Sequence, residues 1–240
     1  MGGDQYDPGY VRAYYDTYGE REWTRLAEGP TSRLNFHIHQ HYLQHYIRPG
    51  DHVLEAGAGP GRFTIELAAC GARTTVGDIS PVQLALNAEK VAAAGCESSV
   101  VERRLLDIAD LAGFPTGGYD AVVCYGGPLS YVFDRADAAV AEMLRVTKPG
   151  GVLLLSVMSL LGTTRAFLAG VLATTRQFGI PANDAVVRTG DLHAGISPHR
   201  CHMYRWSELE ALLARHPCTL LAASASGWST LGNDATLQAT

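Results

Sequence analysis

The segment VLEAGAGPGRF, residues 53–63, restricts the fold of this chain more than any other stretch. A run of mostly apolar residues leads into three glycines in the order G-x-G-x-G, namely Gly57, Gly59 and Gly61, and Phe63, Leu67 and Cys70 then recur at helical spacing. Glycines directly after a strand let the backbone approach a ligand closely, and the helix that follows offers free N–H groups. The segment therefore predicts a strand, a ligand-binding turn and a helix.

The same alternation of strand and helix continues along the chain. We expect strands over 52–56, 74–77, 100–106, 119–125 and 150–158, the last fully buried, and helices over 63–70, 81–95 and from 134 to before Pro149. Ser80 and Pro81 provide an N-cap and a first-turn proline for the second helix. This order predicts an α/β fold, a doubly wound, mostly parallel Rossmann-like sheet with helices on both faces.

The C-terminal third is less regular. Residues 160–178 have a helical pattern, whereas the histidine-bearing stretch 181–204 looks irregular and is too long for an ordinary connection, so we expect a substrate-binding insertion at about 160–205. Ser207 and Glu210 predict a capping box for a following helix. The segment 218–227 predicts a sixth strand, and WSTLGNDATLQAT after it is too short for a further helix and a seventh strand.

Composition excludes several classes of protein. The 240 residues are 47% hydrophobic, which suffices for one core and an appended lid, and the net charge of −5 without charged runs argues against a nucleic-acid partner. Five scattered cysteines contain no C-x-x-C pair, which favours reduced thiols. With no leader-like N-terminus and no run of eighteen apolar residues, we expect a cytoplasmic protein with no membrane partner.

The glycine spacing separates two kinds of nucleotide-binding fold. Arg62 occupies the place of the third glycine in a dinucleotide-binding G-x-G-x-x-G motif, which argues against a pyrophosphate ligand. The spacing instead resembles motif I of the class I S-adenosylmethionine-dependent methyltransferases. As in that family, acidic residues follow three strands in order, Glu55, Asp78 and Asp107, and the resemblance extends from about residue 15 to 230.

The resemblance implies S-adenosylmethionine as cofactor and S-adenosylhomocysteine as product. This cofactor has no phosphate, but it has ribose hydroxyls, an adenine amino group and a methionyl amine, which are all donors that suit carboxylates. By resemblance, Asp78 binds the ribose with Ile79 against the adenine, and Asp107 binds the adenine amino group with Ile108 beside it. The methionyl amine is expected near Glu55 and the carbonyls around Gly57 and Tyr125.

The N-terminal 48 residues are expected to form a helical lid over a domain of residues 49–240. The aromatic side chains of YYDTYGEREW resemble the lid of small-molecule members of the family. Tyr14 and Tyr18 then contact the acceptor, whereas Tyr15 and Arg33 are candidates for binding the methionyl carboxylate. The alternative is that these rings only dock a helix on the sheet.

Two groups of histidines are candidates for a metal site or for catalysis. His37, His41 and His45 share a helical stripe whose spacing can ligate zinc, but no acidic residue accompanies them, so we predict no metal. The second group lies in the expected insertion, where His202, and after it His199, are the candidate bases that deprotonate an acceptor, with His193 and Tyr204 contacting that acceptor. The alternative is that they are ordinary polar loop residues.

The segment YGGPLSY, residues 125–131, follows the fourth strand and includes Tyr131 as a further acceptor contact. It departs from the N/D-P-P-Y/F motif of DNA and RNA amino-methyltransferases and resembles bacterial small-molecule methyltransferases, including those of secondary metabolism. The predicted reaction is in-line displacement of the methyl group by an N, O or C nucleophile. The alternatives are a cofactor-binding protein without methyl transfer and, least favoured, a nicotinamide oxidoreductase. An unpaired sheet edge would favour a homodimer.

Overall fold

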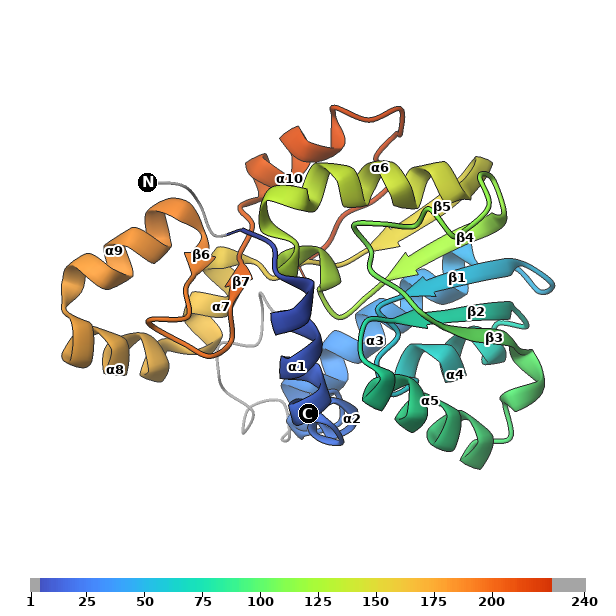
Figure 1. The fold of residues 1–240 in the computed structure, drawn as a ribbon, viewed down its shortest axis with the longest axis horizontal. Coiled ribbons are helices and arrows are strands. Elements are labelled where there is room, and N and C mark those ends of the chain that lie inside the picture. The colour runs from blue at the N-terminus through green and yellow to red at the C-terminus, as the bar shows by residue number, and fades with distance from the viewer. Residues whose placement is uncertain (1–4, 226–240) are drawn as a thin grey trace.

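A central parallel sheet organises the computed structural model, which describes residues 5–225 (Figure 1). The strand order is β3-β2-β1-β4-β5, and every neighbouring pair is parallel. The order reverses at β1 and β4, and this is the point at which open α/β sheets form a ligand crevice beyond the carboxyl ends of their strands. The predicted fold class is confirmed. The strands are β1 (His52–Ala56), β2 (Arg73–Asp78), β3 (Val100–Leu105), β4 (Tyr119–Cys124) and β5 (Thr147–Leu155).

Helices cover both faces of the sheet (Figure 1). On β1, Val53 packs in one apolar cluster with Leu43 and Leu67, and its neighbour Leu54 packs in another with Met143. Successive side chains of a strand point to opposite faces, so one strand contributes to both halves of the core. The covering helices are α3 (Gly29–Tyr46), α4 (Arg62–Ala69) and α5 (Pro81–Ala93) on one face and α6 (Ala136–Val146) and α10 (Trp206–Leu213) on the other.

The C-terminal side of the sheet corrects two predictions. We expected residues 150–158 to be a fully buried strand, but between Val152 and Leu155 only Leu154 is buried, because β5 is the edge of the sheet formed by residues 5–225. The predicted sixth strand over 218–227 is wrong for Cys218–Ala225, where no strand forms. Residues 226 and 227 and the segment WSTLGNDATLQAT lie outside the described residues.

The insertion is more helical than expected. It contains α7 (Leu160–Ala166), α8 (Leu168–Phe178) and α9 (Ile180–Thr189), followed by the short paired strands β6 (Asp191–Leu192) and β7 (Cys201–His202). The prediction of an irregular stretch from 181 was therefore wrong as far as Thr189. The capping box also differs from the prediction, because α10 begins at Trp206. Glu208, not Glu210, accepts the Arg205 backbone N–H, at 3.4 Å.

Short N-terminal helices lie between the sheet and the insertion (Figure 1). The Tyr10 hydroxyl of α1 (Pro8–Tyr18) donates to the Pro198 carbonyl at 2.6 Å, while Gln83 of α5 donates to the Tyr15 and Gly19 carbonyls at 3.1 and 3.2 Å. Among residues 5–225, no helix is long and apolar enough to cross a bilayer. The remaining short helices are α2 (Arg21–Thr24), η1 (Glu97–Ser99), η2 (Pro128–Tyr131) and η3 (Phe133–Arg135).

Candidate cofactor and acceptor site

The three glycines of the β1–α4 turn have different neighbours. All have positive φ angles, +84° at Gly57, +54° at Gly59 and +99° at Gly61. A Cβ on Gly57 would lie 2.3 Å from Pro128 Cγ, and one on Gly61 would lie 3.0 Å from a Val91 methyl group, so these two permit close packing by η2 and α5. A Cβ on Gly59 would have Glu22 Cγ as its nearest neighbour, at 3.6 Å. The turn therefore needs glycine most strongly at its first position.

Asp78 closes the turn from the end of β2. Its Oδ2 accepts the Gly59 N–H at 2.8 Å, and its Oδ1 accepts the Ser80 N–H at 2.9 Å. Burial raises the pKa of Asp78 to about 6, although these backbone donors oppose the shift. A buried carboxylate thus lies at the crevice where β1 and β2 end, in a position to accept further donors.

Glu55 is a second buried carboxylate, and it has a free acceptor. Its Oε2 accepts the Thr64 hydroxyl at 2.6 Å, whereas its Oε1 has no hydrogen-bond partner among the described residues. Burial raises the pKa of Glu55 to about 8. Unpaired acceptors in a protein interior are costly, so this one fits a ligand that supplies a donor beside the glycine turn.

An open pocket of about 320 Å³ follows the ends of β2 and β3. Ile79, Leu106 and Asp107 line it from the sheet, and α1 closes its other side with residues that include Arg12. Apolar walls with a carboxylate suit a flat ring that bears an amino group. Ile108, expected beside the adenine, does not line this pocket but is buried in the core, and Leu106 takes the predicted place.

Arg25, which the sequence does not single out as a candidate, lies near Gly126, just after β4. Its guanidinium makes a bidentate pair with Glu22, with both N–O distances 2.6 Å, and its Nη2 lies 3.3 Å from where a Cβ on Gly126 would be. Arg33, the predicted ligand of the methionyl carboxylate, is instead exposed on α3. The i,i+3 spacing of Glu22 and Arg25 was the signal available in the sequence.

A cluster of aromatic side chains joins three separate parts of the chain. The Tyr131 hydroxyl of η2 lies 2.7 Å from His199 Nε2, and the Tyr15 hydroxyl is hydrogen-bonded to Tyr131. Tyr14 stacks on His199 with centroids 5.3 Å apart, and Tyr18 stacks on Tyr14 at 5.8 Å. Burial, aided by the charge of Arg25, lowers the pKa of His199. The imidazole is therefore neutral near pH 7 and able to accept a proton.

His202, the first choice of base, has both ring nitrogens engaged. Nδ1 lies 2.7 Å from Asp191 and Nε2 lies 2.9 Å from Glu208. Burial lowers the pKa of His202, but the two carboxylates outweigh burial and raise it overall. The buried Tyr204 ring packs edge-on against the His202 ring, with the ring centroids 4.5 Å apart. Of the two candidate bases, His199 therefore has the more suitable surroundings.

The remaining candidate histidines are found on α3 and in the loop before His199. His37, His41 and His45 are exposed on α3, and among the described residues no group of metal-binding side chains is large enough for an ion. The ring of Tyr125 packs on the core side, 4.6 Å from His39, which leaves only its backbone toward the crevice. The His193 carbonyl accepts the backbone N–H groups of 196 and 197 at 2.9 and 3.0 Å and so forms a turn.

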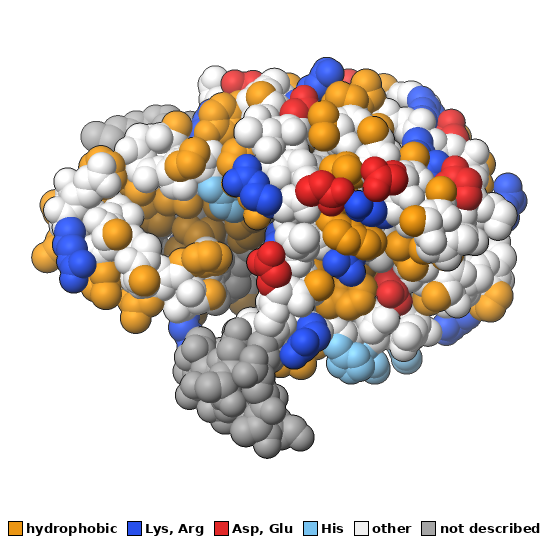
Figure 2. Space-filling view, turned by 90° about the horizontal axis from the view of Figure 1, so that it is seen from below, with side chains coloured by type: hydrophobic (Ala, Val, Ile, Leu, Met, Phe, Trp, Pro, Cys, Tyr) orange, Lys and Arg blue, Asp and Glu red, His pale blue; other side chains and the backbone are white. Residues whose placement is uncertain are grey.

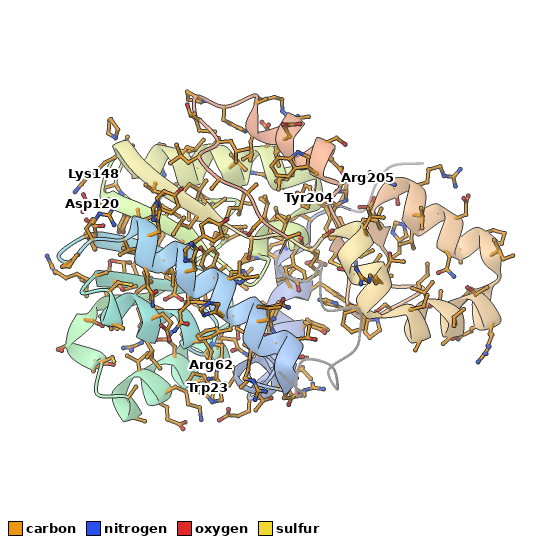
Figure 3. All side chains as sticks on the ribbon, turned by 180° about the vertical axis from the view of Figure 1, so that it is seen from behind. Trp23, Arg62, Asp120, Lys148, Tyr204 and Arg205 are labelled. Carbon is orange, nitrogen blue, oxygen red and sulfur yellow. The ribbon has the colours of Figure 1, made fainter. Side chains whose placement is uncertain are left out.

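Arg62, which argues against the dinucleotide motif, connects α4 to α2. Its Nε donates to the Trp23 carbonyl at 2.9 Å, and its guanidinium lies 3.9 Å from the centre of the Trp23 ring (Figure 3). The residue that replaces the third glycine thus anchors α2 over the start of α4. Cation–π contacts of this kind contribute about 0.5–2 kcal/mol.

Comparison with known proteins agrees with this geometry. A family model described as a methyltransferase domain matches residues 53–151. The chain is 38% identical over 112 residues to a ubiquinone biosynthesis O-methyltransferase of Xanthomonas oryzae pv. oryzae, covering 46% of this chain and 44% of the relative. It is 32% identical over 132 residues to an uncharacterized protein of Mycobacterium bovis, covering 55% and 44%. The chain thus matches less than half the length of these curated relatives.

Solved structures show the same fold. The cyclase SpnF has a TM-score of 0.54 at 22% identity, covering 63% of this chain and 61% of that one. The YcgJ protein of Bacillus subtilis has a TM-score of 0.53 at 17% identity, covering 75% and 67%. The strand order and the match of residues 53–151 to the family model together show that this part of the chain is a Rossmann-like methyltransferase domain, whose cofactor is S-adenosylmethionine.

Proposed function

We propose that this chain transfers the methyl group of S-adenosylmethionine to a hydroxyl oxygen of a small molecule. The observation that supports oxygen over nitrogen or carbon most directly is the Tyr131–His199 hydrogen bond of 2.7 Å, which pairs a neutral imidazole with a phenol at the lid. A hydroxyl acceptor has a proton to lose when it attacks, so a positioned base assists it. The O-methyltransferase relative is consistent with this choice.

The residues of the crevice fit the cofactor. The pocket between Ile79, Leu106 and Asp107 suits the adenine, Asp78 is placed to accept from ribose hydroxyls, and the unpaired Glu55 Oε1 suits an ammonium group. When bound, the cofactor supplies an electrophilic methyl group on a sulfonium. Aligning that group with the acceptor accounts for about 7–11 kcal/mol of barrier reduction in well-oriented reactions.

The aromatic cluster provides a route for the acceptor's proton. Burial raises the pKa of both Tyr15 and Tyr131, so these hydroxyls stay protonated and act as a relay, not as bases. A proton released by the acceptor moves onto the Tyr15 oxygen, the proton of Tyr15 moves to the Tyr131 oxygen, and the proton of Tyr131 moves to His199 Nε2, which becomes an imidazolium. We propose that residues 1–48 act as the lid and about 160–205 as the substrate-binding insertion.

Activity with a panel of phenols and alcohols tests this function, with S-adenosylhomocysteine detected by mass spectrometry. His199→Gln should lower kcat about 100-fold because it removes the proton acceptor, with little change in cofactor affinity by calorimetry. His202→Gln is the matched control and should instead lower thermal stability, since Asp191 and Glu208 lose their shared partner. Equal kcat losses in the two variants would contradict His199 as the base.

Two alternatives give different outcomes in the same assay. Cofactor binding without S-adenosylhomocysteine formation on any acceptor would indicate a binding protein of this fold. Binding of a reduced nicotinamide without S-adenosylmethionine binding would indicate an oxidoreductase, which Arg62 disfavours because it replaces the third glycine.

Partners and location are also proposals. The net negative charge and the YGGPLSY segment support a small molecule over nucleic acid as the partner. Because β5 has no neighbouring strand on one side among residues 5–225, its free edge supports a homodimer. The reduced thiols support a cytoplasmic location. Light scattering across a range of protein concentrations would detect the dimer.

A further inference from the structure

The helices α7, α8 and α9 expose an unusual number of large hydrophobic side chains. Leu161, Ile180 and Phe167 are 79%, 73% and 68% exposed, and no residue of α8 is buried. Figure 2 shows hydrophobic side chains gathered at this end of the molecule and around the hollow beside it. Seven of the 13 large hydrophobic residues exposed among residues 5–225 belong to this patch: Leu161, Phe167, Leu168, Leu172, Phe178, Ile180 and Val187.

The side chain of Asn183 connects α9 to α8 by hydrogen bonds. Asn183 Nδ2 donates to the Val171 carbonyl at 3.1 Å and also to the Thr175 hydroxyl. Leu168 and Leu172 lie one helical turn apart in one stripe of α8 and are 55% and 50% exposed. Monomeric soluble proteins rarely leave a contiguous apolar area of this kind uncovered, so the patch is a candidate interaction surface.

The charge of the same segment is opposite to that of the protein. Residues 160–190 contain Arg165, Arg176 and Arg188 but only one acidic residue, Asp184, for a net charge of +2. Since the whole chain has a net charge of −5, the other residues amount to −7. Arg176 continues the stripe of Leu168 and Leu172 by one more turn and is exposed. The patch therefore combines apolar side chains with cations, and the remainder of the protein repels anions.

We propose that the α7–α9 patch docks on the surface of an anionic lipid bilayer. Its leucine, isoleucine and phenylalanine side chains would enter the boundary between headgroups and acyl chains, and its arginines would pair with lipid phosphates. The acidic remainder of the chain orients the protein so that only this end meets the lipid. Such peripheral contact needs no spanning helix, and none is found among the described residues.

A second copy of the chain is a poorer occupant of the same patch. In a two-fold symmetric contact the same surface meets itself, so the arginines of one copy would face those of the other. An anionic lipid surface is complementary to both the apolar area and the positive charge of the patch. A second copy of the chain is complementary only to the apolar area. Charge complementarity therefore favours lipid.

The patch is continuous with the acceptor side of the candidate site. One buried cluster contains Tyr131, Leu160 at the start of α7 and Val186 of α9. The Tyr131 hydroxyl in turn contacts His199. Docking would place the aromatic cluster near the lipid surface. The docking proposal does not depend on methyl transfer, because its test measures binding to vesicles only.

Co-sedimentation of the full chain with vesicles tests the proposal. We expect binding to vesicles of phosphatidylcholine and phosphatidylglycerol in equal parts, little binding to phosphatidylcholine alone, and release by high salt. The double variant Leu168→Ser and Leu172→Ser should bind at least about tenfold more weakly, because less apolar area is buried at the interface. Arg176→Glu should weaken binding to the anionic vesicles specifically.

Matched variants outside the patch provide the controls. Val101→Ser on β3, where the side chain is 45% exposed, and Arg48→Glu, which is also exposed, should leave vesicle binding unchanged. Thermal melts verify that every variant is folded. The proposal is overturned if the protein binds neither vesicle, if the patch and control variants bind equally, or if light scattering shows a dimer that the patch variants abolish.

Discussion

The cofactor half of this molecule, β1 to α5, and its cap, formed by α1, α2 and residues 156–204, are built in different ways. In the cofactor half the contacts that shape the site are local, with Asp78 binding Gly59 across 19 positions and Glu55 binding Thr64 across nine. In the cap, Tyr10 binds Pro198 across 188 positions, and His199 meets Tyr131 of η2 across 68. Contacts between residues that are close in the sequence produce a recognisable spacing of residue types, whereas contacts between distant residues do not.

The largest effect should come from Gly57→Ala in the cofactor half. A Cβ there would lie 2.3 Å from Pro128 Cγ at a φ of +84°, so both overpacking and backbone strain oppose it. We expect a loss of about 2–5 kcal/mol in the free energy of unfolding, together with loss of cofactor binding. Chemical denaturation and calorimetry measure the two effects.

Gly59→Ala is the matched control for this glycine. It has the same kind of φ angle, +54°, but its nearest neighbour is 3.6 Å away, so only the conformational cost of about 1–2 kcal/mol should appear. Equal losses in the two variants would show that packing by η2 on Gly57 does not shape the turn.

A smaller effect concerns Glu55, which should make stability fall as pH rises. Burial raises its pKa to about 8 in the folded protein, so its stabilising contribution is complete below the ordinary glutamate pKa of 4.5 and is lost as pH rises through 8. Between those limits we expect a decline of about 2–4 kcal/mol in the free energy of unfolding. Denaturation at a series of pH values measures it.

Glu55→Gln should flatten this pH dependence. Asp78, whose pKa burial raises to about 6, would still produce a smaller decline from near 4 up to 6, and Asp78→Asn should remove that part. Saturating S-adenosylmethionine should oppose the decline by pairing its ammonium group with the carboxylate. A flat profile in the wild-type protein would show that Glu55 is hydrated and not buried as described.

The fold of the cofactor half could be predicted because its signals are local. Ser80 accepts the Gln83 N–H at 3.1 Å as the predicted N-cap, and β1 to β4 coincide with the expected apolar segments to within a residue or two. β5 was misjudged because a run of apolar residues is the same whether a strand is central or at an edge. α9 was missed because Pro181 was read as part of a loop, although proline is favoured in a first turn.

The candidate site shows the same division. Acidic residues at strand ends predict the cofactor side without any tertiary information, but the pattern could not say which of Leu106 and Ile108 lines the pocket. In the cap, sequence reasoning ranked His202 above His199 because it could not see Asp191 and Glu208 beside the first ring. Arg33 was predicted as a ligand although it is exposed on α3, because the exposure of a side chain depends on how its helix packs.

An intermediate effect is expected for Asp78→Ala, which acts on binding more than on folding. The variant removes the acceptor for the Gly59 and Ser80 N–H groups and, under the proposed function, an acceptor for the ribose hydroxyls of the cofactor. S-adenosylmethionine affinity should fall by about 1–3 kcal/mol, measured by calorimetry. Arg33→Ala, which changes an exposed residue of α3, is the control and should leave affinity unchanged. Wild-type affinity in Asp78→Ala would argue against this crevice.

The smallest effect should come from Tyr10→Phe, which tests the cap alone. The variant keeps the ring but removes the hydrogen bond of 2.6 Å to the Pro198 carbonyl, at a cost of about 0.5–1.5 kcal/mol. Because this bond joins α1 to the loop that contains His199, hydrogen exchange should speed up in residues 190–200 and stay unchanged in β1 and β2. Tyr18→Phe is the control, since no hydrogen bond from its hydroxyl is described. Faster hydrogen exchange in the cofactor half would mean that the cap and the cofactor half unfold locally together. The conformation of the cap could not then change independently of the cofactor site.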